Sequence, residues 1–125
     1  MTRYTTQLAV TLAAVFILAT ATVLPLQPVY GEGGARRDVM RAEDQHRQEA
    51  LKLAKDAVAH GKQGHADAVV TNAEAALKHA MQAGKGPHVD AAVTELKNAI
   101  EHGKAGHADV ATKHAEAAVT HLSEK

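Results

Sequence analysis

The sequence has no cysteine, no tryptophan and few other aromatic residues, with two tyrosines and one phenylalanine among 125 residues. Without cysteine, the chain cannot form disulfide bonds, thiolate zinc sites or cysteine-ligated iron–sulfur clusters. It also lacks an excess of either charge, because 14 lysines and arginines balance 14 aspartates and glutamates. With no basic surplus to attract phosphates and few rings to stack on bases, we expect no nucleic-acid partner.

The three aromatic residues all precede residue 31, so the rest of the chain must build its core from Ala, Val, Leu, Ile and Met. An alanine side chain buries little apolar area, and a core made of alanines gains little hydrophobic free energy per residue. The length of the chain suits one small domain. We therefore expect a single domain of modest stability.

The N-terminus has the pattern of a secretory signal peptide over residues 1–31. Arg3 precedes an uncharged, mainly apolar stretch at 8–24. Cleavage after Ala21 or after Gly31 fits the pattern, and the later point is favoured because prolines interrupt the apolar stretch before it. An uncleaved anchor is the alternative, since about 17 apolar residues is near the lower limit for crossing a bilayer. We expect an exported, periplasmic protein with no membrane attachment after cleavage.

The remainder of the chain contains a repeat with an offset of 42 residues. The segment Gly-Lys-Gln-Gly-His-Ala-Asp at 61–67 recurs at 103–109 as Gly-Lys-Ala-Gly-His-Ala-Asp. The same offset relates four pairs of histidines, which are His46 and His88, His60 and His102, His65 and His107, and His79 and His121. Such self-similarity indicates two copies of one supersecondary unit, here a helical hairpin.

Each copy contains two segments rich in good helix formers, and the four segments are 47–60, 65–82, 88–102 and 107–122. Glycines separate the segments, and Pro87 is placed to open a helix. Residues 32–45 are expected to be a leader, flexible at 32–35, in which the first helix can start near Arg36. The predicted fold is all-α, an antiparallel up-down-up-down four-helix bundle of two helical-hairpin repeats over residues 46–125.

Histidine is the residue type that points to a function. Eight of the nine histidines form pairs 14 residues apart, which places both members on nearly the same face of a helix. That face is the shoulder of the apolar stripe, partly exposed and beside a neighbouring helix. Imidazole is the commonest protein ligand for transition metals. The candidate metal ligands are His46, His60, His65, His79, His88, His102, His107, His114 and His121.

An antiparallel bundle would collect eight of these histidines at its two ends, about 20 Å apart. The two predicted sets are His60, His65, His102 and His107 at one end, and His46, His79, His88 and His121 at the other. Histidines that face each other across a loop are expected to chelate one ion together, and these pairs are His60 with His65, His79 with His88, and His102 with His107. His114 is too far along its own helix from His107 and His121 to share an ion with them, so it needs a neighbouring helix or binds weakly alone.

Other possible donors have simpler explanations. Glu95 and Asn72 could supply oxygen ligands, but a solvated helix face explains them better. Met40 and Met81 could bind Cu(I) through sulfur, but filling the core explains them better. No enzyme is expected, because a ferritin-like di-iron site needs Glu-x-x-His motifs on facing helices, and the sequence has one, ending at His46.

Three motifs resemble those of the small metal-binding protein family. They are Gly-His-Ala-Asp at 64–67 and 106–109, His-Val-Asp-Ala-Ala-Val at 88–93, and Ala-Glu-Ala-Ala-x-x-His ending at His79 and His121. The resemblance covers about residues 46–125. It implies a four-helix bundle that reversibly binds several divalent metal ions, copper foremost, without catalysis. The chain departs from a fuller histidine pattern at Leu53, Asn72 and Glu95.

Nitrogen ligands without thiolate suit Cu(II), Ni(II) and Zn(II), and affinity generally peaks at Cu(II). We therefore expect Cu(II) as the main ion, bound for buffering or scavenging, with Ni(II) or Zn(II) as further candidates. A monomer is expected, although exposed imidazoles of two molecules can share an ion. The alternative is a structural or interaction module whose histidines sense pH, which predicts acid-dependent behaviour in metal-free buffer.

Overall fold

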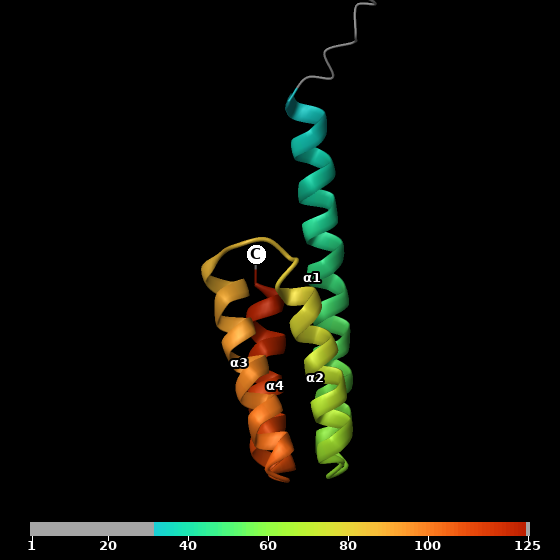
Figure 1. Cartoon of the computed structure of the whole chain (residues 1–125), viewed down its shortest axis with the longest axis vertical. Helices are drawn as coiled ribbons and strands as arrows, with labels where there is room; N and C mark the ends of the chain where they lie inside the picture. Colours follow the sequence, from blue (N-terminus) through green and yellow to red (C-terminus); the bar gives the residue numbers. More distant parts are fainter. Residues whose placement is uncertain (1–31, 125) are drawn as a thin grey trace, which may run out of the picture.

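The computed structural model describes residues 32–124, and the predicted signal peptide lies outside them. Four α-helices make up most of this part of the chain (Figure 1), and they are α1 (Glu32–Lys62), α2 (Ala66–Ala80), α3 (Pro87–Lys104) and α4 (Ala108–Ser123). No strand occurs between residues 32 and 124. The prediction of an all-helical protein is therefore confirmed for the described residues.

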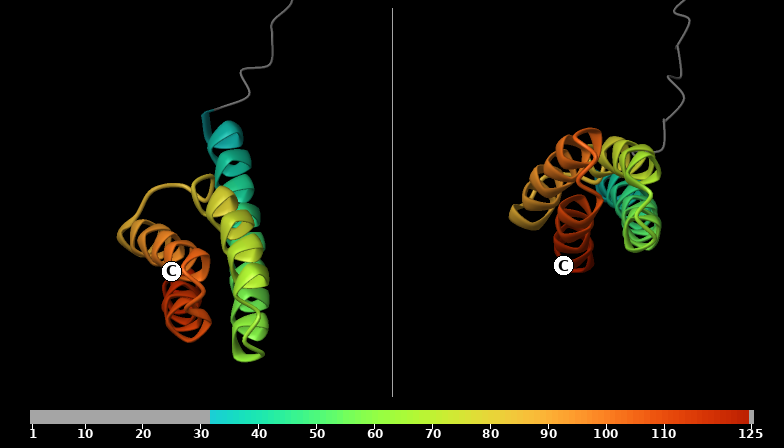
Figure 2. Two further views of the ribbon diagram at one scale, coloured as in Figure 1. Left: turned by 60° about the horizontal axis from the view of Figure 1, so that its bottom comes forward. Right: turned by 90° about the horizontal axis from the view of Figure 1, so that it is seen from below.

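The four helices pack as a bundle in which each helix has two main neighbours. α1 packs against α2 and α4, and α3 packs against the same two helices. In Figure 1 the chain descends through α1 and α3 and ascends through α2 and α4, and Figure 2 shows consecutive helices side by side. We call α1 with α2 the first hairpin, and α3 with α4 the second hairpin.

Glycine shapes the turn inside each hairpin. Gly64 has φ of +77°, a left-handed conformation that a residue with a Cβ rarely adopts. The amide of Gly64 donates to the carbonyl of Gly61 at 2.9 Å, and the amide of His65 donates to the carbonyl of His60 at 3.1 Å. These two bonds define a Schellman motif, which ends a helix and reverses the chain. The same two bonds recur around Gly106 in the second hairpin.

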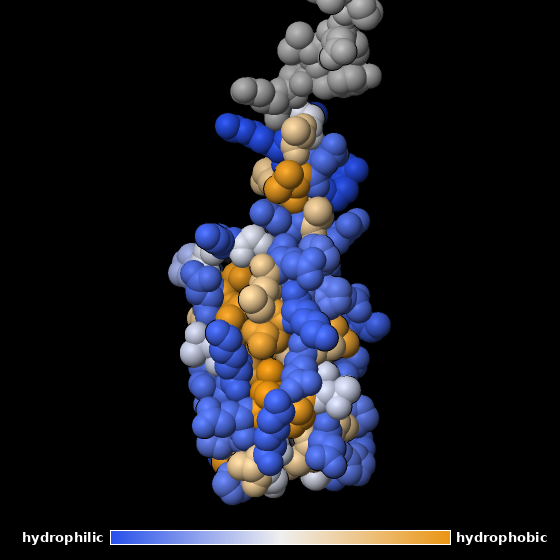
Figure 3. Space-filling view, viewed as in Figure 1, coloured by the Kyte–Doolittle hydropathy of each residue, from blue (hydrophilic) through white to orange (hydrophobic). Residues whose placement is uncertain are grey.

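α1 is longer than the sequence analysis predicted. It begins at Glu32 rather than near Arg36, so residues 32–35 are helical and the expected flexible leader there is wrong. Each added helical residue gains a hydrogen bond, and no proline stands in this segment to stop the helix. The first turns of α1 project beyond the bundle (Figure 1), and Val39 and Met40 there are exposed. Figure 3 shows apolar surface on this projecting part. Among residues 32–124, no helix combines the length and apolar character needed to cross a membrane.

The core between the helices is built mainly from alanine. Leu96, Leu122 and Val69 are the largest fully buried side chains, and the other fully buried core residues are alanines. Larger apolar side chains pack around this core while staying partly exposed, and they are Leu51, Leu53, Val58, Leu77, Val93, Ile100 and Val119. Figure 3 shows an apolar strip along the seam between helices, flanked by polar side chains. The small alanines allow the helices to approach closely, while two leucines supply much of the buried bulk.

Two glycines within helices mark close approaches between the hairpins. Gly61 of α1 lies against the side chain of Thr112 of α4, and Gly103 of α3 lies against the side chain of Val70 of α2. A Cβ at either position would overlap these neighbours. The Thr112 side chain is also held in place, because its hydroxyl donates to the carbonyl of Ala108.

Replacing Gly61 by alanine is expected to lower the free energy of unfolding by about 1–3 kcal/mol, because the added methyl group overlaps Thr112. Gly33→Ala is the matched control, since Gly33 also lies in α1 and an added Cβ there meets nothing within 4 Å. Alanine is the better helix former, so this control should be neutral or slightly stabilising. Chemical denaturation compares the two variants, and equal stability would contradict the close approach at Gly61.

Candidate metal centre

All nine histidines lie in the described part of the chain. Seven are half-buried, while His65 and His107 are exposed. These two residues stand at the N-cap positions of α2 and α4, yet neither side chain forms a capping hydrogen bond. Their imidazoles are therefore not used to stabilise the helix ends.

The turn inside each hairpin brings two histidines together. In a Schellman motif the residue that closes the turn lies beside the residue five positions earlier. In the first hairpin these residues are His60 and His65, whose ring centroids are 6.3 Å apart. In the second hairpin they are His102 and His107, whose ring centroids are 6.2 Å apart. Two of the three predicted loop pairs are thus in contact.

At the open end of each hairpin, the two helices supply one histidine each. The rings of His46 and His79 have centroids 5.5 Å apart, and their Nδ1 atoms are separated by 3.2 Å. The centroids of His88 and His121 are 6.3 Å apart. The predicted pairing of His79 with His88 is therefore wrong, because each ring lies against the other helix of its own hairpin. The longer connection at 81–86 carries the chain from one hairpin to the next instead of folding back in a tight turn.

The ring separations of all four pairs lie within the limit for a shared metal ion, and the three of 6.2–6.3 Å require the two nitrogens to lie on nearly opposite sides of the ion. An ion binds imidazole nitrogen at about 2.0–2.1 Å, and the ring centre lies about 1.1 Å behind that nitrogen, so two coordinating rings have centroids at most about 6.4 Å apart. The four measured separations run from 5.5 to 6.3 Å. These contacts join histidines of the same hairpin, so each predicted set of four takes the form of two pairs.

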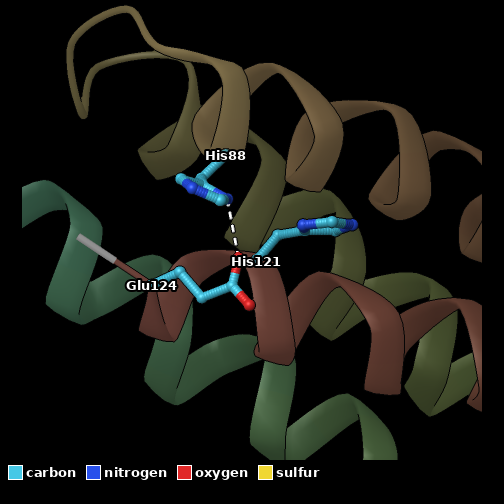
Figure 4. A group of neighbouring side chains, drawn as sticks. All are labelled: His88, His121 and Glu124. Atoms are coloured by element: carbon cyan, nitrogen blue, oxygen red, sulfur yellow. Dashed lines mark ion pairs between the residues drawn. The ribbon is translucent and has the colours of Figure 1, made fainter.

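One group also contains a carboxylate. His88, His121 and Glu124 each offer a ligand atom within 4.8 Å of the other two. In Figure 4 the imidazole of His88, on α3, points toward the carboxylate of Glu124, with Nδ1 at 2.7 Å from Oε2, while the ring of His121, on α4, extends to one side of this pair. Two donors on opposite sides of one ion are about 4 Å apart. The side chains would therefore have to move closer together to surround a metal ion.

Two of the histidines have a buried nitrogen that lacks a partner. Nδ1 of His60 and Nδ1 of His121 are buried without a hydrogen bond. A buried polar atom left unpaired costs about 1–3 kcal/mol. The two nitrogens belong to histidine pairs in different hairpins. Coordination of a metal ion would give each of them a partner.

His114 extends the loop pair of the second hairpin. Its ring is stacked on that of His102, with centroids 5.2 Å apart and planes inclined by 5°. Its Nδ1 lies 2.7 Å from Oε2 of Glu95, a half-buried residue of α3. The assignment of Glu95 to a solvated helix face is therefore wrong. A carboxylate on one ring nitrogen fixes the imidazole and leaves the other nitrogen for a metal ion.

Glu124 was not predicted as a donor, and neither methionine lies where it was predicted. Glu124 follows His121 by three residues, and this helical spacing was the signal that could have identified it. Met40 and Met81 are exposed rather than buried in the core. Met40 lies on the projecting part of α1, and Met81 follows the last residue of α2, so neither reaches the bundle interior.

Two ion pairs link the hairpins. Lys62 of α1 lies 3.0 Å from Glu116 of α4, and Lys104 of α3 lies 2.8 Å from Glu74 of α2. The hydrogen bond from Lys104, together with its charge, lowers the pKa of the Glu74 carboxyl. All four side chains are largely exposed, so these pairs contribute little to stability.

Paired imidazoles with carboxylates beside them, on a helical scaffold without thiolates, form the donor set of a metal-ion-binding protein. Comparison with known families agrees with this class. Residues 8–125 match the family model described as small metal-binding protein, and the chain belongs to that family. No curated protein matches the chain.

Proposed function

We propose that this protein reversibly binds several divalent metal ions through its histidines, copper foremost, and buffers or scavenges them in the periplasm. The observation that carries the proposal is the group of His88, His121 and Glu124, whose ligand atoms lie within 4.8 Å of one another. The other three histidine pairs supply further sites of similar ring spacing. The role is binding rather than catalysis.

The donor chemistry supports copper as the main ion. Imidazole and carboxylate groups without thiolate suit Cu(II), Ni(II) and Zn(II), and the affinity order for such ligands generally peaks at Cu(II). Half of the pairs include a well-exposed ring, His65 or His107, which an ion can reach without opening the bundle. We expect Ni(II) and Zn(II) to bind the same sites more weakly.

The proposed location rests on the N-terminal sequence. An uncharged stretch at 8–24 follows Arg3, as in a secretory signal peptide. We propose that the chain is exported, cleaved after Ala21 or Gly31, and acts as a monomeric antiparallel bundle of two repeated hairpins. Histidines without cysteines suit an exported protein that meets metals as divalent ions.

Calorimetric titration with Cu(II) at pH 7.5 and pH 5.5 tests the binding. Because protonated imidazole cannot ligate and an ordinary imidazole titrates near pH 6.5, affinity should fall about 10-fold for each imidazole that a site uses. Ni(II) and Zn(II) are titrated alongside, and Mg²⁺ serves as the control because it prefers oxygen ligands.

Saturable heat from Cu(II) that weakens at the lower pH is the expected outcome. Absence of Cu(II) heat, or heat that matches Mg²⁺, would refute the proposal. In that case circular dichroism in metal-free buffer with EDTA, recorded across the same pH range, would test the alternative of an acid-sensing structural module.

A further inference from the structure

The two hairpins carry equivalent histidine pairs. At the open ends, His46 with His79 in the first hairpin corresponds to His88 with His121 in the second, because both members are shifted by 42 residues. The pairs beside the turns correspond in the same way, with ring separations of 6.3 Å and 6.2 Å. The open-end pairs differ in ring separation, at 5.5 Å and 6.3 Å, so a difference in metal binding between the hairpins comes from this spacing or from the residues around the pairs.

Among the positions that differ between the hairpins, three carry residues that contact histidines in the second hairpin. The first hairpin has Leu53, Asn72 and Gln82 where the second has Glu95, His114 and Glu124. In the second hairpin all three residues contact histidines. Glu124 pairs with His88, His114 stacks on His102, and Glu95 bonds to His114.

The corresponding residues of the first hairpin are occupied elsewhere. The amide of Asn72 donates to the carbonyl of Ala68 at 2.9 Å, and the amide of Gln82 donates to the carbonyl of Lys78 at 3.0 Å. Leu53 packs against the core. The first hairpin thus offers its metal ions two imidazoles per pair, with no third donor from these three positions.

We propose that the second hairpin is the high-affinity half of the protein and fills before the first. This inference rests on the proposed metal binding and states the order in which the two hairpins bind ions. A third donor lengthens the residence of an ion, and the negative charge of Glu124 offsets part of the charge of a divalent cation. Glu95 acts through His114, which it orients, as carboxylates commonly orient metal-binding imidazoles. The second hairpin therefore has one site with a carboxylate ligand and one with a third imidazole.

The variants exchange residues between corresponding positions of the two hairpins. Glu124→Gln gives the second hairpin the residue of the first, and Gln82→Glu does the reverse. Glu101→Gln is the matched control, because it removes the same charge from an exposed position of α3. Cu(II) is added in steps below one equivalent, and proton NMR follows the paramagnetic broadening of each histidine ring. Calorimetry on the same samples gives affinities and the total number of ions bound.

At the first additions, the rings of His88 and His121 should broaden before those of His46 and His79. Glu124→Gln should weaken the first binding event about 10–100-fold, whereas Glu101→Gln should leave it unchanged. Gln82→Glu should produce a second site of high affinity in the first hairpin.

Equal broadening of both hairpins at the first additions would overturn the proposed order while leaving metal binding itself intact. An effect of Glu101→Gln as large as that of Glu124→Gln would also overturn it, because only general charge would then matter. Absence of any Cu(II) binding in calorimetry would refute the proposed function and this inference together.

Discussion

Replacing Leu96 by alanine is expected to lower the free energy of unfolding by about 2–5 kcal/mol. Leu96 is fully buried in a core where almost all neighbours that are equally buried are alanines. Small residues cannot move far enough to fill the cavity, so the substitution loses both buried area and packing contacts. A small domain has about 5–15 kcal/mol of stability in total, and this one variant would remove a large share of it. Denaturant unfolding followed by circular dichroism measures the change.

Leu53→Ala is the matched control for this prediction. Leu53 is also a helical leucine, but it packs on the outside of the core and stays partly exposed. Its loss should cost clearly less than the loss of Leu96. If both variants lose the same free energy of unfolding, full burial of Leu96 does not make it more important to the stability of the core than Leu53.

Saturation with Cu(II) is expected to raise the melting temperature by about 10–20 °C for each ion bound. An ion at about 100 times its dissociation constant adds about 2.7 kcal/mol to the stability of the folded state. A domain of this size gains about 4–8 °C for each kcal/mol. The effect arises because each histidine pair joins two helices or closes a turn, and the unfolded chain does not hold these rings together. Differential scanning calorimetry measures the shift, and excess EDTA should reverse it.

The variant that carries both His88→Ala and His121→Ala serves as the control for this shift. It lacks the two imidazoles of the group that includes Glu124, while both side chains are only half-buried and their loss leaves the core intact. Its rise in melting temperature should be smaller than that of the original protein. An identical rise would mean that copper stabilises the fold through other groups.

Much of the fold could be predicted from glycine, proline and periodicity. Gly64 and Gly106 indicated the turns, and Pro87 indicated the start of α3, where the structure places it. The first turns of α1 could not be predicted in the same way. Residues 32–35 were expected to be flexible, but the helix continues through Gly33 and Gly34 because no neighbouring residue forces it to end.

The histidine positions followed from helical spacing, while their partners depended on how the helices meet. The pair of His60 and His65 is local, because one turn fixes it, and spacing along the chain was enough to find it. The pair of His46 and His79 depends on the register between α1 and α2, which no short segment encodes. Glu95 was misjudged for the same reason, since its partner His114 belongs to another helix.

The separation between the two ends of each hairpin bears on how the protein responds to changing metal supply. His46 and His60 are 14 residues apart on α1, a distance of about 21 Å. Charges this far apart are screened at physiological ionic strength, where the Debye length is about 8 Å. An ion at one end therefore neither repels nor recruits an ion at the other. Occupancy should rise gradually over a wide span of free copper, with a Hill coefficient below one if the hairpins differ in affinity as proposed, so that the protein behaves as a reservoir rather than a switch.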